Sequence, residues 1–259
     1  MNYIEIIGPQ GAGKTTLLKK LMQLRGEDDD WCTVDEAIIE IAGKVRWKDL
    51  NKGWQRTLWF MRKADFFNTK INGLSNALVK KLRGKEDLTA KKKYEYLIMA
   101  QIKAIAELEM DISPLNLFSL MVMNYSALDR LLLLEEFNFS RTVVMDEGPF
   151  KTHYGLKYIN TENIDKETLP SAVVFVTIDP EINVERIMKR YDETGSLSRI
   201  HSSINRDSIP EVTPKLHTIL EENLKTMYKL KIPVIELDLG EELNPKTVDD
   251  VGEFITLYS

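Results

Sequence analysis

Short apolar runs alternate along the chain with longer stretches in which apolar residues recur every three or four positions. The β-branched and aromatic content of the short runs predicts buried strands at 3–7, 31–34, 142–145, 172–178 and 234–237. Helical spacing follows the first run, with Leu17, Leu18, Leu21 and Leu24 on one face. Strands that alternate with helices predict a mostly parallel sheet, whose ligands bind at the carboxyl ends of the strands.

Residues from about 49 to 137 interrupt this alternation, because they show helical spacing and no strand pattern. Apolar residues step by three and four from Phe60 to Leu78, and again from Ile98 to Leu108. Pro114 is typical of the first position of a further helix. We expect these residues to form an all-helical insertion in a single domain that spans residues 1–259.

Composition excludes several classes of protein. Of the 259 residues, 43% are hydrophobic and 29% are charged, which is typical of a globular domain. The formal net charge of −5 disfavours a general nucleic-acid binder. No apolar run approaches the roughly 20 residues that span a bilayer, and no signal-peptide pattern opens the sequence. With Cys32 as the single cysteine, we expect a reducing, cytoplasmic setting.

The first predicted strand leads into a glycine-rich segment, Gly-Pro-Gln-Gly-Ala-Gly-Lys-Thr, which fits the phosphate-loop pattern G-x-x-x-x-G-K-[ST]. Glycines let successive backbone N–H groups turn inward toward an anion, and the N-terminus of the following helix adds its positive dipole end. We expect Lys14 to reach the β- and γ-phosphates of a nucleotide and Thr15 to ligate Mg²⁺. The expected phosphate-binding residues are Gly8, Gln10, Gly11, Ala12, Gly13, Lys14, Thr15 and Thr16.

The strand predicted at 142–145 ends in two carboxylates, Asp146 and Glu147. An aspartate at a strand tip beside a phosphate loop is where P-loop proteins anchor Mg²⁺. Asp146 is therefore the expected second metal ligand. Glu147 has three interpretations: in an ATPase it would orient the attacking water, in a small-molecule kinase the carboxylates at this edge would hold the metal or the acceptor, and otherwise its role is structural.

Two further carboxylates, Asp35 and Glu36, follow the second predicted strand. Either could accept the proton of an attacking hydroxyl or hold the acceptor through its hydroxyl groups. The alternative is structural, because an acidic residue in the first turn of a helix complements the helix dipole. Both residues stay candidates.

Arginines surround a Gly/Ser-rich stretch near residues 194–208. Arg186 and Arg190 lie four residues apart and so share one helix face, while Arg199 and Arg206 lie within the stretch. Phosphoryl transfer gains from cations that close over the γ-phosphate and from a lid that excludes water. We expect a lid loop at about 191–209, with Arg186 and Arg190 as catalytic cations.

On these residues the chain resembles the P-loop kinases of the nucleoside and nucleotide kinase group, and their thymidylate-kinase-like branch in particular. The resemblance rests on the phosphate loop, the strand tip at Asp146, the stretch 173–190 and the strand at 233–239. It implies a three-layer α/β/α fold with a five-stranded parallel sheet in the order 2-3-1-4-5. It also implies ATP and Mg²⁺ as cofactors, and an acceptor bound between the second strand and the inserted helices.

The resemblance does not identify the acceptor, because the Arg-Glu-Pro-like signature of thymidylate kinases is absent after the second strand. A nucleoside, a nucleotide, a sugar or another small hydroxyl compound would fit a kinase. The second interpretation is an ATPase or regulatory switch that uses Glu147 to activate water and the helical insertion to bind a partner. A polynucleotide-end kinase is a third, disfavoured by the acidic charge. We expect no membrane partner, and a homodimer is compatible with the sequence.

Overall fold

In the computed structural model, five strands pair in parallel to form one sheet in the order β2-β3-β1-β4-β5, which confirms the fold class and strand order expected from the sequence. The strands are β1 (Tyr3–Ile7), β2 (Trp31–Thr33), β3 (Thr142–Met145), β4 (Ala172–Thr177) and β5 (Val234–Asp238). The structure describes residues 1–26, 29–46, 50, 56, 59, 92–107, 114–146, 148–150, 156–159, 164–195, 206–240 and 243–259.

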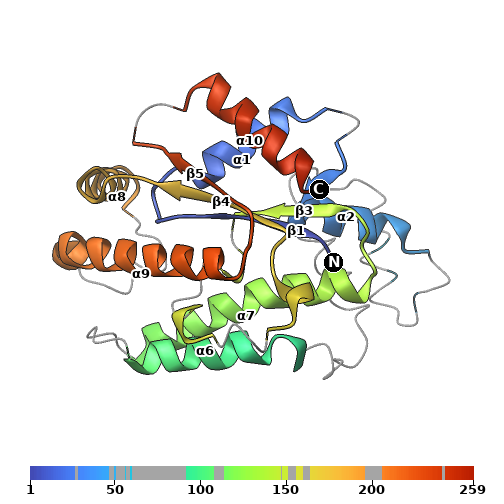
Figure 1. Cartoon of the computed structure of the whole chain (residues 1–259), viewed down its shortest axis with the longest axis horizontal. Coiled ribbons are helices and arrows are strands. Elements are labelled where there is room, and N and C mark those ends of the chain that lie inside the picture. Colours follow the sequence, from blue (N-terminus) through green and yellow to red (C-terminus); the bar gives the residue numbers. More distant parts are fainter. Residues whose placement is uncertain are drawn as a thin grey trace.

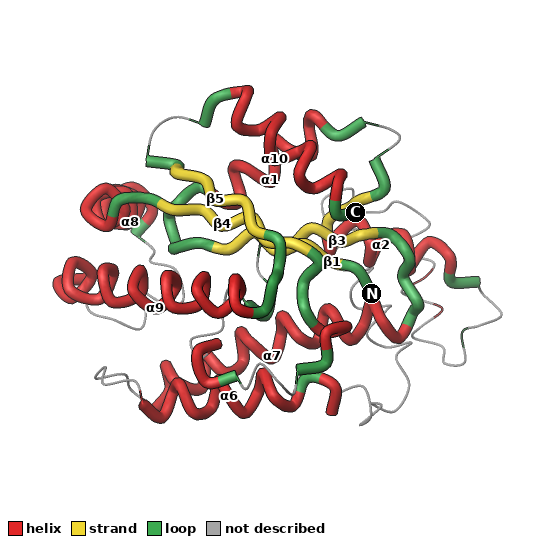
Figure 2. Tube along the Cα trace, viewed as in Figure 1, coloured by secondary structure: helices red, strands yellow, loops and turns green. Residues whose placement is uncertain are grey.

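Helices cover both faces of the sheet (Figures 1 and 2). One face carries α1 and α10, and the other carries α2, α7 and α9, with α6 lying against α7. None of the helices in the described ranges has the length and apolar content to cross a bilayer. Their bounds are α1 (Lys14–Leu24), α2 (Val34–Lys44), α6 (Glu95–Glu107), α7 (Pro114–Glu136), α8 (Pro180–Thr194), α9 (Ile209–Lys229) and α10 (Pro245–Leu257), with 3-10 turns η2 (Leu156–Tyr158), η3 (Lys166–Thr168) and η5 (Arg206–Ser208).

The central strand β1 divides the hydrophobic core into two layers, because successive side chains of a strand point to opposite faces. Ile4 and Ile6 pack with the residues of α1 and α10. Tyr3 and Ile7 pack on the other face, with the residues of α2 and α7. Burial of both faces explains why this strand is an almost continuous apolar run.

Most described residues of the segment expected as an insertion lie in α6 and α7. Helix α7 begins at Pro114, as its sequence predicts. Glu135 near the end of α7 accepts hydrogen bonds from Lys93 and Tyr94, which precede α6, so the two helices run in opposite directions. The helix expected between Phe60 and Leu78 lies outside the described residues, as does most of the expected lid loop.

The second strand is shorter than its apolar run, because Val34 is the first residue of α2. Thr33 caps this helix: its Oγ1 accepts from the N–H of Glu36, and the Glu36 carboxylate accepts from the N–H of Thr33 at 2.8 Å. Such a reciprocal capping box satisfies two backbone donors that the helix start leaves open. Asp35 and Glu36 therefore lie in the first turn of a helix rather than in a strand end.

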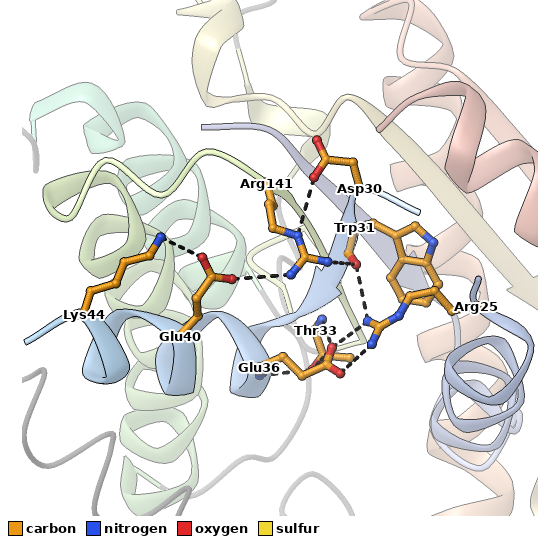
Figure 3. Close-up of polar contacts among 8 residues, drawn as sticks. All are labelled: Arg25, Asp30, Trp31, Thr33, Glu36, Glu40, Lys44 and Arg141. Carbon is orange, nitrogen blue, oxygen red and sulfur yellow. Dashed lines mark hydrogen bonds and ion pairs between the residues drawn. The ribbon is translucent and has the colours of Figure 1, made fainter. Parts of the chain in front are cut away.

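Glu36 also joins α2 to the end of α1 (Figure 3). Both of its carboxylate oxygens accept from the Arg25 guanidinium at 2.8 Å, and this guanidinium lies 5.0 Å from the ring centre of Trp31. The charged hydrogen bonds of Arg25 lower the pKa of Glu36 from its ordinary 4.5 to about 2. A second ion pair of the same helix joins Glu40 to Arg141, the residue before β3, with the nitrogen and oxygen 3.4 Å apart.

The lowered pKa of Glu36 predicts an acid-dependent loss of stability. A carboxyl whose pKa is lower in the folded than in the unfolded chain stabilises the fold above its unfolded pKa, and that contribution is lost as pH falls through the folded pKa. We expect wild type to exceed Glu36→Gln in free energy of unfolding by about 1–2 kcal/mol at pH 7, since solvent screens a side chain that is one-third exposed. The difference should shrink as pH falls from about 5 toward 2.

Urea unfolding of both proteins at a series of pH values measures this difference. The glutamine keeps the capping oxygen, and other titrating carboxylates such as Glu40 contribute equally to both proteins. A difference that stays constant down to pH 2 would show that the ion pair with Arg25 contributes nothing.

Candidate functional site

The glycine-rich segment forms a tight loop between β1 and α1, at the carboxyl end of the central strand. Gly8, Gly11 and Gly13 all have positive backbone φ angles, which residues other than glycine rarely adopt. Gly8 also lies so close to β4 that a Cβ would stand 2.4 Å from the carbonyl oxygen of Val176. Gly13 is the residue before α1, so the loop ends at the positive pole of that helix.

Lys14, the first residue of α1, is 6% exposed. Its ammonium group turns back over the loop and donates to the carbonyl oxygen of Gly8 at 2.7 Å and to that of Pro9. These contacts hold the ammonium charge of Lys14 beside the glycines. An anion bound in the loop would therefore meet both this charge and the backbone N–H groups. Of the remaining loop residues, Ala12 is buried, Gln10 is half-buried and Thr16 is exposed.

Thr15 and Asp146 meet across the end of the sheet, as their positions in the sequence predict. The Thr15 hydroxyl donates to the Asp146 carboxylate, with Oγ1 and Oδ2 2.7 Å apart. The pairing of β1 with β3 brings Asp146 to the edge of the sheet where the loop lies, because Glu5 stands opposite Met145 and both strands end there. A hydroxyl and a carboxylate are oxygen donors of the kind that Mg²⁺ takes beside phosphate oxygens.

A buried glutamate, Glu5 of β1, supports the segment that follows Asp146. It is 0% exposed, and its Oε2 accepts from the N–H of Phe150 at 3.2 Å. A Cβ at Gly148 would stand 2.3 Å from Glu5 Cδ, so a larger residue there would have to displace the Glu5 side chain. Glu5 was not predicted as a site residue from the sequence, although a single carboxylate in an otherwise apolar strand is a visible signal. Glu147 itself lies outside the described residues.

Asp35 and Glu36 lie in the first turn of α2, just beyond the carboxyl end of β2, and they differ in their surroundings. Thr33 pairs with Val144 of the next strand, so Asp35 and Asp146 each lie two residues beyond a paired position at the same edge of the sheet. Asp35 is exposed there. Glu36 is committed to Arg25 and Thr33, and a carboxyl with a pKa near 2 is a weak base.

The arginines predicted to close over the phosphates have different contacts. Arg186 donates to the carbonyl oxygens of Leu239 and Gly240, each at 3.0 Å, which ties α8 to the segment after β5. Arg206 donates to Asp192 at 2.9 Å, near the end of α8. Arg190 lies one turn beyond Arg186 and is exposed. The phosphate contacts of these arginines stay predictions, and Arg199 lies outside the described residues.

Asn183 of α8 contacts the phosphate loop and was not predicted from the sequence. Its amide Nδ2 donates to the carbonyl oxygen of Gln10 at 2.7 Å, and its side chain is 1% exposed. An asparagine on an amphipathic helix gives no signal by itself, because its contact depends on where the helix packs.

Within the described residues, no group of three or more histidine, cysteine, aspartate or glutamate side chains could hold a metal ion.

No family model and no curated protein matches the chain. Among solved structures, a shikimate kinase from Bacteroides thetaiotaomicron is similar with a TM-score of 0.36 and 12% sequence identity, over 99% of this chain and 97% of that one. At so low a TM-score and identity, the neighbour's activity is no guide to what this chain acts on.

Proposed function

We propose that this chain is an ATP- and Mg²⁺-dependent phosphotransferase that moves the γ-phosphate of ATP to a hydroxyl or phosphate group of a small molecule. The observation that carries the proposal is the hydrogen bond between Thr15 and Asp146, 2.7 Å long, beside a loop with three positive-φ glycines and a buried lysine. Each of these features serves a polyphosphate bound with a divalent cation.

The donor side of the proposed site is the phosphate loop. Lys14 would exchange its contacts with the Gly8 and Pro9 carbonyls for oxygens of the β- and γ-phosphates. A loose phosphoryl-transfer transition state spreads negative charge over the equatorial oxygens, and a fixed ammonium stabilises that charge without reorganising. Arg190, exposed on α8, is the arginine we propose to approach the same oxygens.

Thr15 and Asp146 are the residues that would hold Mg²⁺. Their oxygens fit the preference of this cation for a few protein ligands together with phosphate and water. When bound, the ion neutralises charge that develops between the β- and γ-phosphates.

The acceptor side is the edge of the sheet beyond β2 and β3. Of the two carboxylates there, we carry Asp35 forward as the group that orients the acceptor and takes its proton, because Glu36 is engaged by Arg25. Nucleosides, nucleotides and sugars all offer a hydroxyl or phosphate to such a site. We infer ATP rather than GTP because the sequence has no Asn-Lys-x-Asp base-reading motif.

The first experiment is Mg²⁺-dependent ATP turnover with and without a panel of nucleosides, nucleotides and sugars, followed by mass measurement of each acceptor. We expect one class of acceptor to raise turnover and to gain the mass of one phosphate. Hydrolysis of ATP to free phosphate that no acceptor changes would instead favour the ATPase switch.

Replacing Lys14 should abolish turnover while the chain still folds. We expect Lys14→Ala to lower kcat by about 100-fold or more, because a preorganised cation is lost from the transition state. Lys19→Ala is the matched control, since Lys19 is an exposed lysine on the same helix. Thermal unfolding of both variants checks the fold, and a near-wild-type rate in folded Lys14→Ala would refute the phosphate-loop assignment.

Asp146 and Glu147 distinguish the two candidate activities. In a kinase, Asp146→Asn should cost more turnover than Glu147→Gln, because only Asp146 would hold the metal. Asp146→Asn should also shift the Mg²⁺ dependence of turnover to higher concentrations. If Glu147→Gln is the more damaging change, water activation by Glu147 and the switch interpretation gain support.

A further inference from the structure

The tip of the phosphate loop is a β-turn of residues 9–12. The N–H of Ala12 donates to the carbonyl oxygen of Pro9 at 3.4 Å, which closes the turn. Gly11, the third residue of the turn, has a φ of 84°. That value matches a type II turn, whose third residue has φ near +80°, and differs in sign from a type I turn.

Types I and II differ in the orientation of one peptide group, the central one of the turn. Here that group joins Gln10 to Gly11, and its carbonyl oxygen accepts the 2.7 Å hydrogen bond from Asn183. In a planar trans peptide, the carbonyl and the N–H point in opposite directions. Fixing the Gln10 carbonyl toward α8 therefore turns the Gly11 N–H away from α8.

Asn183 is closely fitted to this peptide. A Cβ on Gly11 would stand 3.0 Å from Asn183 Nδ2 and 3.3 Å from Ile187, so helix and loop are in direct contact. The capped start of α8 holds Asn183 in place, because its backbone N–H donates to the carbonyl of Asp179 at 2.8 Å.

His217 of α9 contacts the other end of the same amide. Its Nε2 lies 3.0 Å from Asn183 Oδ1. A carbonyl oxygen only accepts, so the Asn183 nitrogen must face Gln10, its oxygen must face His217, and His217 Nε2 must donate. Burial lowers the pKa of His217, which favours the neutral ring.

We propose that Asn183 and His217 are positioning residues that hold the Gln10–Gly11 peptide in the type II orientation, so that the Gly11 N–H is ready to bind a phosphate oxygen. This inference rests on the proposed function, since it takes the loop as a polyphosphate site. Without the two side chains the peptide can flip, and a flipped peptide presents a carbonyl oxygen to the anion. Neither residue touches the reacting atoms, so both act through the loop.

The test is the affinity of tripolyphosphate in the presence of Mg²⁺, measured by isothermal titration calorimetry on the full chain. We expect Asn183→Leu to weaken binding about tenfold, because a hydrogen bond that orients a charge-binding group is lost. His217→Leu should weaken it about threefold to tenfold. His217→Gln offers an amide N–H in place of Nε2–H, and we expect an affinity within about twofold of wild type.

Asn223→Leu is the matched control, because Asn223 is also 1% exposed and lies on α9, about 9 Å along the helix from His217. We expect it to change thermal stability and to leave the affinity of the folded protein unchanged. The fold of each variant is checked by its thermal transition.

The outcomes separate this inference from the proposed function. If wild type does not bind tripolyphosphate, the phosphate-loop function fails, and the inference fails with it. If wild type binds and Lys14→Ala does not, but Asn183→Leu binds as wild type does, the positioning role alone is overturned. If Asn183→Leu does not fold, the His217 pair decides, and equal affinities of His217→Gln and His217→Leu would overturn the proposal.

Discussion

The parallel pairing of β1 with β3 and β4 is the constraint on which the rest of the site depends. Because β1 is central, the loop that follows it is flanked by the ends of both neighbouring strands. On one side the end of β3 brings Asp146 to the Thr15 hydroxyl, and on the other the backbone of Val176 lies against Gly8. Glu5, inside β1, supports the chain beyond Asp146. A single strand thus places the loop, the aspartate and the segment after it.

Helix α8 joins the phosphate loop by hydrogen bonds to two segments that come much later in the chain. Along one helix, Asn183 holds the Gln10 carbonyl, Arg186 holds the carbonyls after β5, and Asp192 accepts from Arg206. α8 and α9 also pack against each other. From its start to its end, α8 therefore contacts the phosphate loop, the segment after β5 and the turn before α9. A movement of α8 would change all three contacts.

Local pattern was enough to predict the strands, the parallel sheet and the phosphate loop, because each is encoded by neighbouring residues. The Thr15–Asp146 contact was also predictable, since strand ends of a parallel sheet share an edge. The partners of charged side chains were not. Glu36 has the sequence signature of a helix cap and of a base alike, and only packing brings Arg25 to it. Arg186 meets carbonyls that lie 53 and 54 residues away along the chain.

The bond between Arg25 and Glu36 has a mechanical consequence. It fastens the last turn of α1 to the first turn of α2, and the Trp31 ring packs against the same guanidinium. Helix α1, which carries Lys14, and helix α2, which carries Asp35, are thereby joined near the end of one and the start of the other. On the opposite flank the connection runs through side chains in series, because Asn183 of α8 holds the loop and His217 of α9 holds Asn183.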